Sequence, residues 1–255
     1  MRLFKYLILL SLFLCPSVEA AGRLDYLKGA TSSFSCADCS GTAVLIWGCD
    51  TTTVTSGSAP TCGCADQDTT ASAVGEATIT TGECIFNDAG NNGDDYYVLD
   101  SPSTSDLVGT VFIKFYFTTI VNNAILFKIY QGAGNQLSVY ITDTGRLVGY
   151  YNGGATDTVT LATGTAVSTG SYFTLRYRWK AAEAGTDHQM TLYNAALAQI
   201  DDLAEDDDLV AFEIDPAYIH VGLNSTSANG SNFKISYVHL YAEWVDTDAY
   251  ATQVP

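Results

Sequence analysis

Basic residues are scarce in this chain of 255 residues. Lysine and arginine total 11 against 28 aspartates and glutamates, and the formal net charge is −17 at pH 7. This imbalance argues against nucleic acid and against an anionic membrane surface as partners, because both are bound through Lys and Arg. It favours solubility, and it suits Ca²⁺, a cation that takes oxygen ligands.

Long apolar runs are absent apart from one near the start. Residues 6–15 are rich in Leu, they follow Arg2 and Lys5, and small residues lead up to Ala20. The run is shorter than the ~20 residues that a membrane-spanning helix needs. A basic start, a short apolar run and a small-residue cleavage site are typical of a secretory signal peptide. We therefore expect residues 1–20 to be removed, and the protein to be secreted, extracellular or at the cell surface, without a membrane span.

Cysteine is missing after residue 84. Beyond the expected signal peptide the chain has six cysteines, which are Cys36, Cys39, Cys49, Cys62, Cys64 and Cys84. An even number of cysteines in an exported protein predicts disulfides, although their pairing cannot be read from sequence. The spacing of Cys36 and Cys39 also fits zinc ligands, and this alternative stays open. We expect a small Cys-rich module over residues 21–77, which a bridge to Cys84 could fix to the part that follows.

Helical periodicity is absent as well, and alternation takes its place. From about residue 77 onward, short alternating segments are divided by turns rich in Gly, Asn and Asp. This pattern is typical of an all-β, antiparallel sandwich. The predicted strands are 111–117, 124–130, 137–141, 146–151, 157–161, 172–180, 189–193, 218–222 and 233–244. The acidic run 205–208 is expected to be a solvated loop.

Two of these strands indicate which face is buried. In 172–180, large apolar residues alternate with polar or basic ones, and 233–244 ends in the same way. Because successive side chains point to opposite faces of a strand, one set should pack in the core. The expected core positions are Phe173, Leu175, Tyr177, Trp179, Val238, Leu240, Ala242 and Trp244. The expected outer positions are Thr174, Arg176, Arg178, Lys180, Tyr237, His239, Tyr241 and Glu243.

Three segments, taken in order, resemble the laminin G-like, or concanavalin A-like lectin/glucanase, family. The first is 86–102, an aromatic residue, a Gly- and Asp-rich turn and a strand that ends in Asp-Ser-Pro. The second is 170–177, with Tyr172 at the family's usual tryptophan position. The third combines 219–222 with 233–241, and is similar to the two closing strands of the family.

The resemblance implies a jelly-roll β-sandwich over residues 78–245, preceded by the Cys-rich module and followed by a tail over residues 246–255. Members of the family are mostly non-catalytic modules that bind glycans or proteins, often with Ca²⁺ at one rim. Some relatives are glycoside hydrolases or polysaccharide lyases, and fold alone does not decide between these activities. Lys234 and Ser236 stand where the family usually has Gly and Asp, so no subfamily is indicated.

A catalytic carboxylate motif is present only in part. The related hydrolases place Glu-x-Asp-x-x-Glu on one strand, because retaining glycosidases need two carboxylates close together. Glu213 and Asp215 begin this motif, but Tyr218 stands at the third position and Pro216 disfavours a central strand. We therefore expect no enzyme, with a glycosidase or polysaccharide lyase as the minority alternative.

The outer positions offer a candidate ligand-binding face. Tyr237, His239 and Tyr241 would form a row, and Arg176 and Arg178 would add hydrogen-bond donors. Sugar rings stack on aromatic faces, and charged donors bind hydroxyls strongly. These residues are therefore predicted to bind a carbohydrate, and the alternative is a solvated face with cross-strand pairs. The same His, Tyr and Arg types could supply a lyase's acid–base groups if their strands were neighbours.

Oxygen-bearing side chains and glycines alternate closely over residues 87–95. Such a segment suits a Ca²⁺ loop, and equally a long polar turn. The predicted ligands are Asp88, Asn91, Asp94 and Asp95, which Asp143 or Asn224 could complete. Ca²⁺ is the one cofactor expected, and no organic cofactor is indicated.

These features predict a secreted, non-catalytic binding or adhesion protein. Its expected partner is an extracellular polysaccharide or glycan, or a surface protein. The alternative class is a structural surface or filament subunit that makes protein contacts, which the Cys-rich module and the Tyr- and Thr-rich strands would allow.

Overall fold

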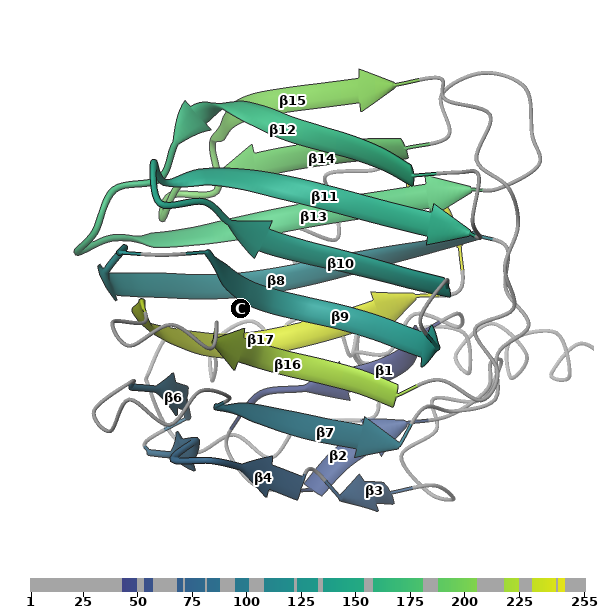
Figure 1. Ribbon diagram of the computed structural model, residues 1–255, viewed down its shortest axis with the longest axis vertical. Helices are drawn as coiled ribbons and strands as arrows, with labels where there is room; N and C mark the ends of the chain where they lie inside the picture. Colours follow the sequence, from purple (N-terminus) through teal and green to yellow (C-terminus); the bar gives the residue numbers. More distant parts are fainter. Residues whose placement is uncertain are drawn as a thin grey trace, which may run out of the picture.

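The computed structural model is a β-sandwich of two antiparallel sheets (Figure 1). It describes residues 43–49, 53–56, 68–70, 72–80, 82–87, 95–100, 108–121, 123–132, 135–153, 158–180, 188–205, 218–224, 231–241 and 243–245. The predicted all-β sandwich is confirmed, because every regular element within these ranges is a strand. Within them, no helical segment has the length and apolar character that crossing a membrane requires.

The ten-stranded sheet has the order β15-β14-β13-β8-β17-β1-β2-β3, with β6 paired to β17 and β5 to β6. Its strands are β1 (Ala43–Trp47), β2 (Thr53–Ser56), β3 (Asp68–Thr70), β5 (Thr78–Ile79), β6 (Cys84–Phe86), β8 (Val108–Thr119), β13 (Tyr172–Lys180), β14 (His188–Tyr193), β15 (Gln199–Glu205) and β17 (Asn232–Tyr241). The central strand is β17, since β8 pairs along one side and β6 and β1 share the other.

The seven-stranded sheet has the order β12-β11-β10-β9-β16-β7-β4. Its strands are β4 (Ser72–Val74), β7 (Tyr96–Asp100), β9 (Ala124–Gly132), β10 (Asn135–Ile141), β11 (Arg146–Gly153), β12 (Thr158–Ala166) and β16 (Tyr218–Asn224). Strands β9 to β12 follow one another as antiparallel neighbours, and β16 then joins them to β7. This meander presents one broad face to the outside of the sandwich.

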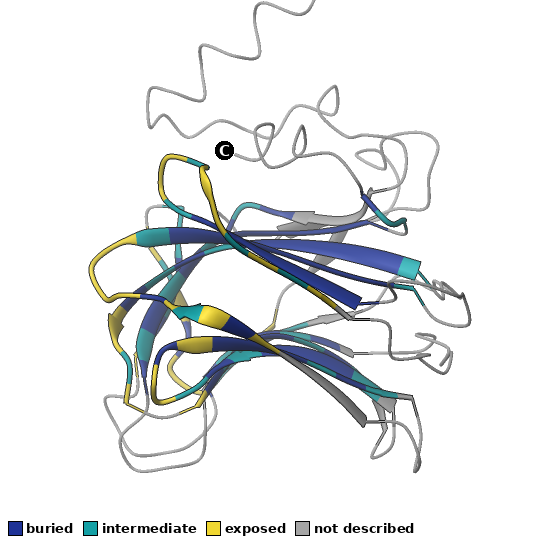
Figure 2. Cartoon of the chain, turned by 90° about the horizontal axis from the view of Figure 1, so that it is seen from above, coloured by how far each residue is buried: buried dark blue, intermediate teal, exposed yellow. Residues whose placement is uncertain are grey.

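The core lies between the two sheets, as the alternation predicts. Figure 2 shows the sheets as two layers, with buried positions along the strands and exposed ones mainly in the loops at one end. Both sheets supply large side chains to this layer, and those of β13 that were expected inside are there: Phe173, Leu175, Tyr177 and Trp179. Burying such apolar surface is the main favourable term in folding.

A β-bulge explains how β17 keeps its apolar side chains inside. The pairing with β8 shifts register between Ile235 and Tyr237. Phe233 and Ile235 before the shift, and Val238 and Leu240 after it, all belong to the core. One inserted residue therefore reverses the alternation once, which is what a bulge does.

Two glycines make room for core aromatic rings, Gly222 for a ring of the opposite sheet and Gly109 for a ring of the neighbouring strand. A Cβ at Gly222 would lie 2.2 Å from the ring of Phe86, and the φ of Gly222 is +77°. A Cβ at Gly109 would lie 2.2 Å from the Trp179 ring. Both aromatic rings occupy space that any other residue would fill, and Gly222 also has a backbone conformation that disfavours L side chains.

The sandwich extends further toward the start of the chain than expected. Strand β1 pairs with β17 in one sheet, and β4 pairs with β7 in the other. Trp47 and Cys49 belong to the main core. The boundary expected at residue 77 therefore does not separate these strands from the sandwich, because their pairing partners lie far along the sequence.

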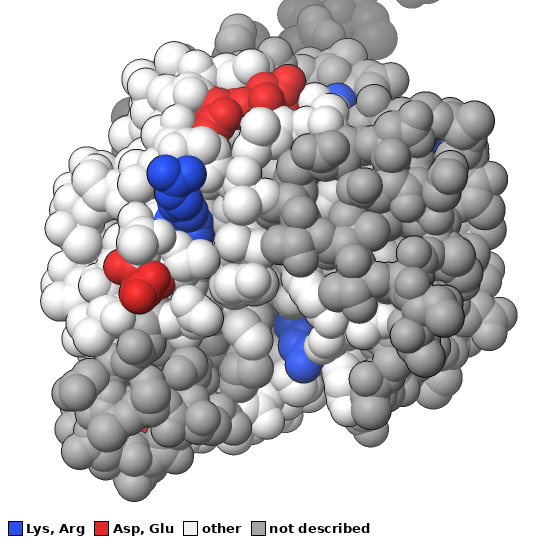
Figure 3. All heavy atoms as spheres, turned by 45° about the horizontal axis from the view of Figure 1, so that its top comes forward, with Lys and Arg blue, Asp and Glu red and all other residues white. Residues whose placement is uncertain are grey.

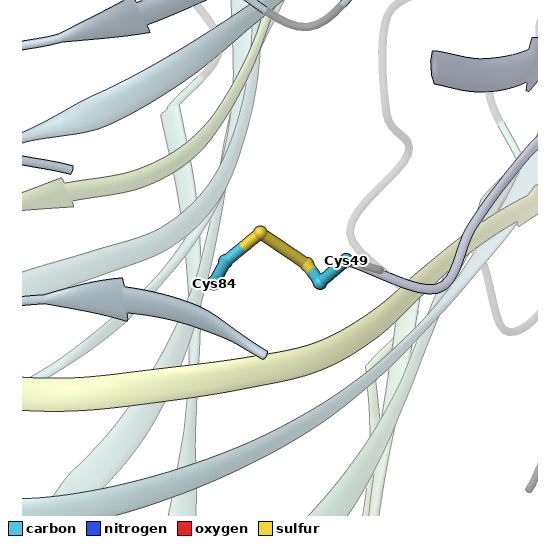
Figure 4. The surroundings of a disulfide bond; sticks show 2 residues. All are labelled: Cys49 and Cys84. Carbon is cyan, nitrogen blue, oxygen red and sulfur yellow. A yellow bond between two sulfur atoms is a disulfide. The ribbon is translucent and has the colours of Figure 1, made fainter. Parts of the chain in front are cut away.

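A disulfide joins Cys49 to Cys84, with 5.2 Å between their Cα atoms (Figure 4). Both cysteines are completely buried. The predicted bridge from the Cys-rich segment to Cys84 is thus present, and it connects the chain after β1 to the start of β6. The other predicted disulfide cysteines, Cys36, Cys39, Cys62 and Cys64, lie outside the described residues, as do the expected signal peptide and the tail over 246–255.

The edge strands β12 and β15, one from each sheet, lie side by side (Figure 1). An Asp201 carboxylate oxygen accepts a hydrogen bond from the Thr165 N–H at 2.7 Å. A side chain of one sheet therefore satisfies a backbone donor at the edge of the other. The sequence pattern predicts no strand at β15, and Glu205, expected in a loop, is its last residue.

Candidate functional site

The predicted ligand-binding residues share the outer face of the ten-stranded sheet. Arg176 and Arg178 come from β13, and the three aromatic residues come from β17. Strand β8 runs between these two strands, so that Phe112 separates Arg176 from His239 in the register. Two strand spacings put such positions about 10 Å apart. The strands that a lyase would need as neighbours are therefore not adjacent.

These five side chains are buried, not exposed as the alternation suggested. The most exposed of them is Arg178, at 7%. Strand β17 ends at Tyr241, and residues 243–245 lie across the same outer face. Trp244, expected in the core, instead lies against Arg178, with 4.5 Å from the guanidinium carbon to a ring centroid. Ligand binding by the five residues would require residues 243–245 to leave this face.

A second, smaller apolar cluster forms under this segment. It consists of Phe112, Tyr193, Tyr237, Tyr241 and Val245. Thr110 Oγ1 donates to the Glu243 carbonyl at 2.6 Å and accepts from the Val245 N–H at 3.0 Å. The segment is therefore fixed by its backbone as well as by apolar contact.

The two arginines use their donors inside the protein. Arg178 donates to the Gln189 side-chain oxygen at 2.7 Å and to the Val245 carbonyl at 2.6 Å. Arg176 donates to Thr191 at 2.9 Å, and the Asp202 carboxylate accepts from both Gln189 and Thr191 at 2.8 Å. Strands β13, β14 and β15 are thus joined by a polar network that runs from the buried arginines to the exposed Asp202, and this explains the basic side chains without a ligand.

His239 does not have the properties of a general base at neutral pH. Burial lowers its pKa to about 3. Acid–base catalysis works best when the pKa of the group lies near the operating pH. The low pKa of His239 and the position of β8 between β13 and β17 therefore both speak against a lyase site made of these residues.

The predicted Ca²⁺ ligands Asp88, Asn91 and Asp94 lie outside the described residues. Asp95 is described, and it is buried. Its carboxylate accepts a hydrogen bond from the Glu76 N–H at 2.6 Å, which holds the turn between β4 and β5. No group of three or more His, Cys, Asp or Glu side chains that could hold a metal occurs in the described part of the chain.

The outer face of the seven-stranded sheet carries a different set of aromatic residues. Its outward side chains alternate with core residues such as Phe127, Ile129 and Tyr151. Eight of these outward side chains make up what we call the tyrosine face, and they are Tyr96, Lys128, Tyr130, Gln136, Tyr140, Tyr150, Asn152 and His220. All eight are partly exposed. Solvent therefore reaches the tyrosine face, which is the aromatic part of the outer surface of the seven-stranded sheet.

Strand register brings these residues into rows across the sheet. Lys128 of β9 lies between His220 of β16 and Ser138 of β10, and Ser138 in turn faces Tyr150 of β11. The neighbouring row contains Tyr130, Gln136 and Asn152. Four consecutive strands thus supply one continuous polar and aromatic surface.

Ring and hydrogen-bond contacts orient these side chains. Lys128 Nζ lies 4.4 Å from the centroid of the Tyr130 ring, a cation–π contact. Asn152 donates from Nδ2 to the Tyr150 hydroxyl at 3.2 Å. At the other end of the face, the rings of Tyr96 and His220 stack with centroids 4.7 Å apart. Such contacts limit rotamer freedom, so less entropy would be lost on binding a ligand.

The electrostatics of the tyrosine face follow from partial burial. Burial lowers the pKa of Lys128, and the nearby Tyr150 acts in the opposite direction. Burial raises the pKa of Tyr140, and Tyr150 raises it further. The Tyr140 hydroxyl therefore remains protonated and able to donate a hydrogen bond at neutral pH. Figure 3 shows charged side chains only at separated points of the described surface in that view.

The ten-stranded sheet has an exposed aromatic region too, at the end that residues 243–245 do not reach. Tyr116 and Tyr172 lie there with ring centroids 5.0 Å apart, close to Lys114. Glu83 forms a 3.0 Å salt bridge with Lys234 and also accepts a hydrogen bond from the Tyr172 hydroxyl. The acidic side chain of Glu83 thus belongs to this region, whereas Lys128 on the tyrosine face has an aromatic ring beside it.

The sequence contained a signal for the tyrosine face that the prediction did not use. Lys128 and Tyr130, and Ser138 and Tyr140, are each two residues apart within predicted strands, and Asn152 directly follows the predicted strand that holds Tyr150. Period two indicates that each pair shares a face. Which of the two outer faces stays open cannot be seen from such a pattern.

No family model matches the chain, and no curated protein matches its sequence. Solved structures do resemble the fold. A structure of botulinum neurotoxin type C, whose entrance into cells depends on two ganglioside molecules, has a TM-score of 0.59 at 11% identity, over 86% of this chain and 52% of the other. The binding domain of botulinum neurotoxin DC in complex with SialylT has a TM-score of 0.54 at 10% identity, over 73% and 46%.

The same binding domain in complex with rat synaptotagmin II gives a TM-score of 0.56 at 9% identity, over 80% of this chain and 49% of the other. This chain therefore spans about half the length of these structures. At such identities the likeness shows a shared sandwich fold.

Proposed function

We propose that this chain is a secreted, non-catalytic binding protein that recognises carbohydrate through the tyrosine face. The observation that carries the proposal is that three adjacent strands, β9, β10 and β11, each present a partly exposed tyrosine on one face, with amide and hydroxyl groups between them. The faces of sugar rings stack on aromatic rings, and their hydroxyls exchange hydrogen bonds with groups such as Asn152 and Gln136. The leader-like segment over residues 1–20 supports an extracellular location.

The structural likeness supports binding at a cell surface. The similar structures are described with gangliosides, with SialylT and with a protein receptor. Those ligands belong to those proteins, and a protein partner for this chain is the second possibility. The partly polar character of the tyrosine face favours a sugar, since the centres of protein interfaces are more apolar.

Alanine substitution of Tyr130 and of Tyr150, made singly, tests the proposal. We expect each change to weaken retention on a responsive glycan roughly tenfold, because an aromatic stacking contact contributes about 1 kcal/mol beyond its buried area. The measurement is a glycan array followed by affinity electrophoresis, with Tyr116→Ala as the control, since Tyr116 is a partly exposed tyrosine of the other sheet. Retention unchanged in both face variants would exclude this site.

The same array, run with excess Ca²⁺ and with chelator, tests the calcium part of the proposal. Ca²⁺ held by the predicted ligands of residues 88–95 would raise both retention and Tm. Equal results in the two buffers would exclude a metal role.

A further inference from the structure

Three of the partly buried lysines on the outer faces of the two sheets, Lys114, Lys128 and Lys234, differ in their acidic neighbours. Lys234 pairs with Glu83 at 3.0 Å. Lys114 also has Glu83 near enough to oppose the effect of burial on its pKa. Lys128, by contrast, contacts no carboxylate among the described residues, and its neighbours are the Tyr130 ring and Tyr150. Of these three lysines, Lys128 is therefore the one that has no acidic side chain beside it among the described residues.

Partial burial makes this arrangement costly. An ammonium group loses hydration when aromatic side chains surround its stem, and a cation–π contact compensates only in part. No hydrogen bond from Lys128 Nζ to another described side chain is present, while an ammonium has three donors. Those donors are available on the tyrosine face, in the row that also holds Tyr150 and next to the row that holds Tyr130.

We propose that the sugar bound on the tyrosine face is acidic, and that Lys128 Nζ binds its carboxylate or sulfate group. This inference depends on the proposed function, and it specifies the class of ligand. A saccharide ring stacked on Tyr130 or Tyr150 would direct a ring substituent toward Lys128. The neighbours of Lys128 in its row, Ser138 and His220, are uncharged or weakly basic groups, so they would not repel an anion.

The overall charge of the chain makes the position of this lysine important. With a net charge of −17, the protein repels anionic polymers at long range. Salt at about 0.15 M screens charges beyond roughly 8 Å, whereas a direct contact with a partly buried ammonium persists. Attraction of an acidic glycan therefore has to come from a local contact, and within the tyrosine face Lys128 is the residue that supplies it.

Two polymer pairs of matched backbone test the inference with the full-length secreted protein. One pair is polygalacturonate and its methyl ester, and the other is dextran sulfate and dextran, all measured by affinity electrophoresis at about 0.15 M salt. We expect the charged member of at least one pair to bind tenfold or more tightly. The first pair identifies a carboxylate ligand and the second a sulfate.

Three variants assign the preference to Lys128. Lys128→Met removes the charge but keeps the length, and it should abolish the preference while leaving binding of the neutral member. Lys128→Arg should retain most of the preference. Lys114→Met makes the same change on the other sheet and should behave as wild type. Thermal unfolding of each variant checks that it is folded.

Each other outcome has a defined meaning. Equal binding of charged and neutral members, still lost in Tyr130→Ala, overturns the acidic ligand but keeps the proposed function. A preference that survives Lys128→Met overturns the role of Lys128. If none of the four polymers binds but polyglutamate is captured in a Lys128-dependent way, the partner is an acidic protein and both proposals are overturned. If nothing binds at all, both proposals are overturned as well.

Discussion

At the scale of single residues, two of the three histidines, His188 and His239, are buried in the fold. His188 is completely buried, and its Nδ1 lies 2.8 Å from the Tyr177 hydroxyl. Its Nε2 has no hydrogen-bond partner. Burial lowers the pKa of His188 to about 4 and that of His239 to about 3. Both side chains are therefore neutral in the folded protein at physiological pH.

This burial predicts that mild acid destabilises the protein. Below pH ~6.5 the unfolded chain binds a proton at each histidine, whereas folded His188 stays neutral down to about pH 4. The contribution of each buried histidine to the free energy of unfolding is thus fully present above pH ~6.5. It decreases as the pH falls, and at pH 5 the loss is about 2 kcal/mol per histidine. Denaturant unfolding at pH 7 and pH 5 measures the loss.

The variant His188→Gln isolates the contribution of one histidine. Glutamine can still accept a hydrogen bond from Tyr177, but it does not titrate. The difference in unfolding free energy between pH 7 and pH 5 should be about 2 kcal/mol smaller than in wild type. His239→Gln should act in the same direction. If His188→Gln shows the wild-type pH dependence, His188 is protonated in the folded state.

At the scale of elements, the segment after β17 decides what the ten-stranded sheet exposes. Thr110→Val is nearly isosteric, and it removes the hydrogen bonds to both Glu243 and Val245. We expect a loss of about 1–3 kcal/mol, because buried backbone groups lose their partner. Release of the segment should also increase binding of a hydrophobic dye to the second cluster.

Thr174→Val is the matched control for this prediction. Thr174 is also buried on the outer face, but its side chain has only a 3.4 Å contact with the Tyr237 hydroxyl. Its replacement should cost less than Thr110→Val and should not increase dye binding. Equal losses in the two variants would mean that Thr110 does not hold the segment in place.

Alternation predicted most strands of the sandwich because their local pattern agrees with their burial. Strands β8, β13 and β17 each have an apolar face that sequence displays directly. Strand β15 was missed because carboxylates interrupt its pattern, and it sits at an edge where solvent accepts them. Strand β1 was assigned to the Cys-rich module, since nothing local shows that its partner is β17.

The candidate site was harder to predict than the strands. The phase of β13 and β17 correctly placed Arg176 and Tyr237 on the outer face, but their burial depends on residues 243–245, which fold back over it. Strand phase describes one strand and its two sides. It does not report a segment that covers one side, and so it could not show that the five predicted ligand-binding residues are covered while the tyrosine face of the other sheet is partly exposed.

At the scale of the whole molecule, the disulfide between Cys49 and Cys84 links the region of β1 to the rest of the sandwich. Replacing both Cys49 and Cys84 by alanine should lower the unfolding free energy by about 2–4 kcal/mol, given the sequence separation of 35 residues. Denaturant unfolding without reductant measures this change. A loss well under 1 kcal/mol would show that pairing of β1 with β17 holds this region without the bridge.

The contact between Asp201 and Thr165 also bears on how copies of the chain can associate. Sheets polymerise when an exposed edge accepts a strand from another molecule, and charged edge residues oppose this. Here an Asp201 carboxylate oxygen already occupies a donor of β12, and β15 carries several carboxylates. Two such edges would repel each other. A fibre of these molecules, if one exists, would have to grow through faces or loops and not through continuous hydrogen-bonded sheets across this edge.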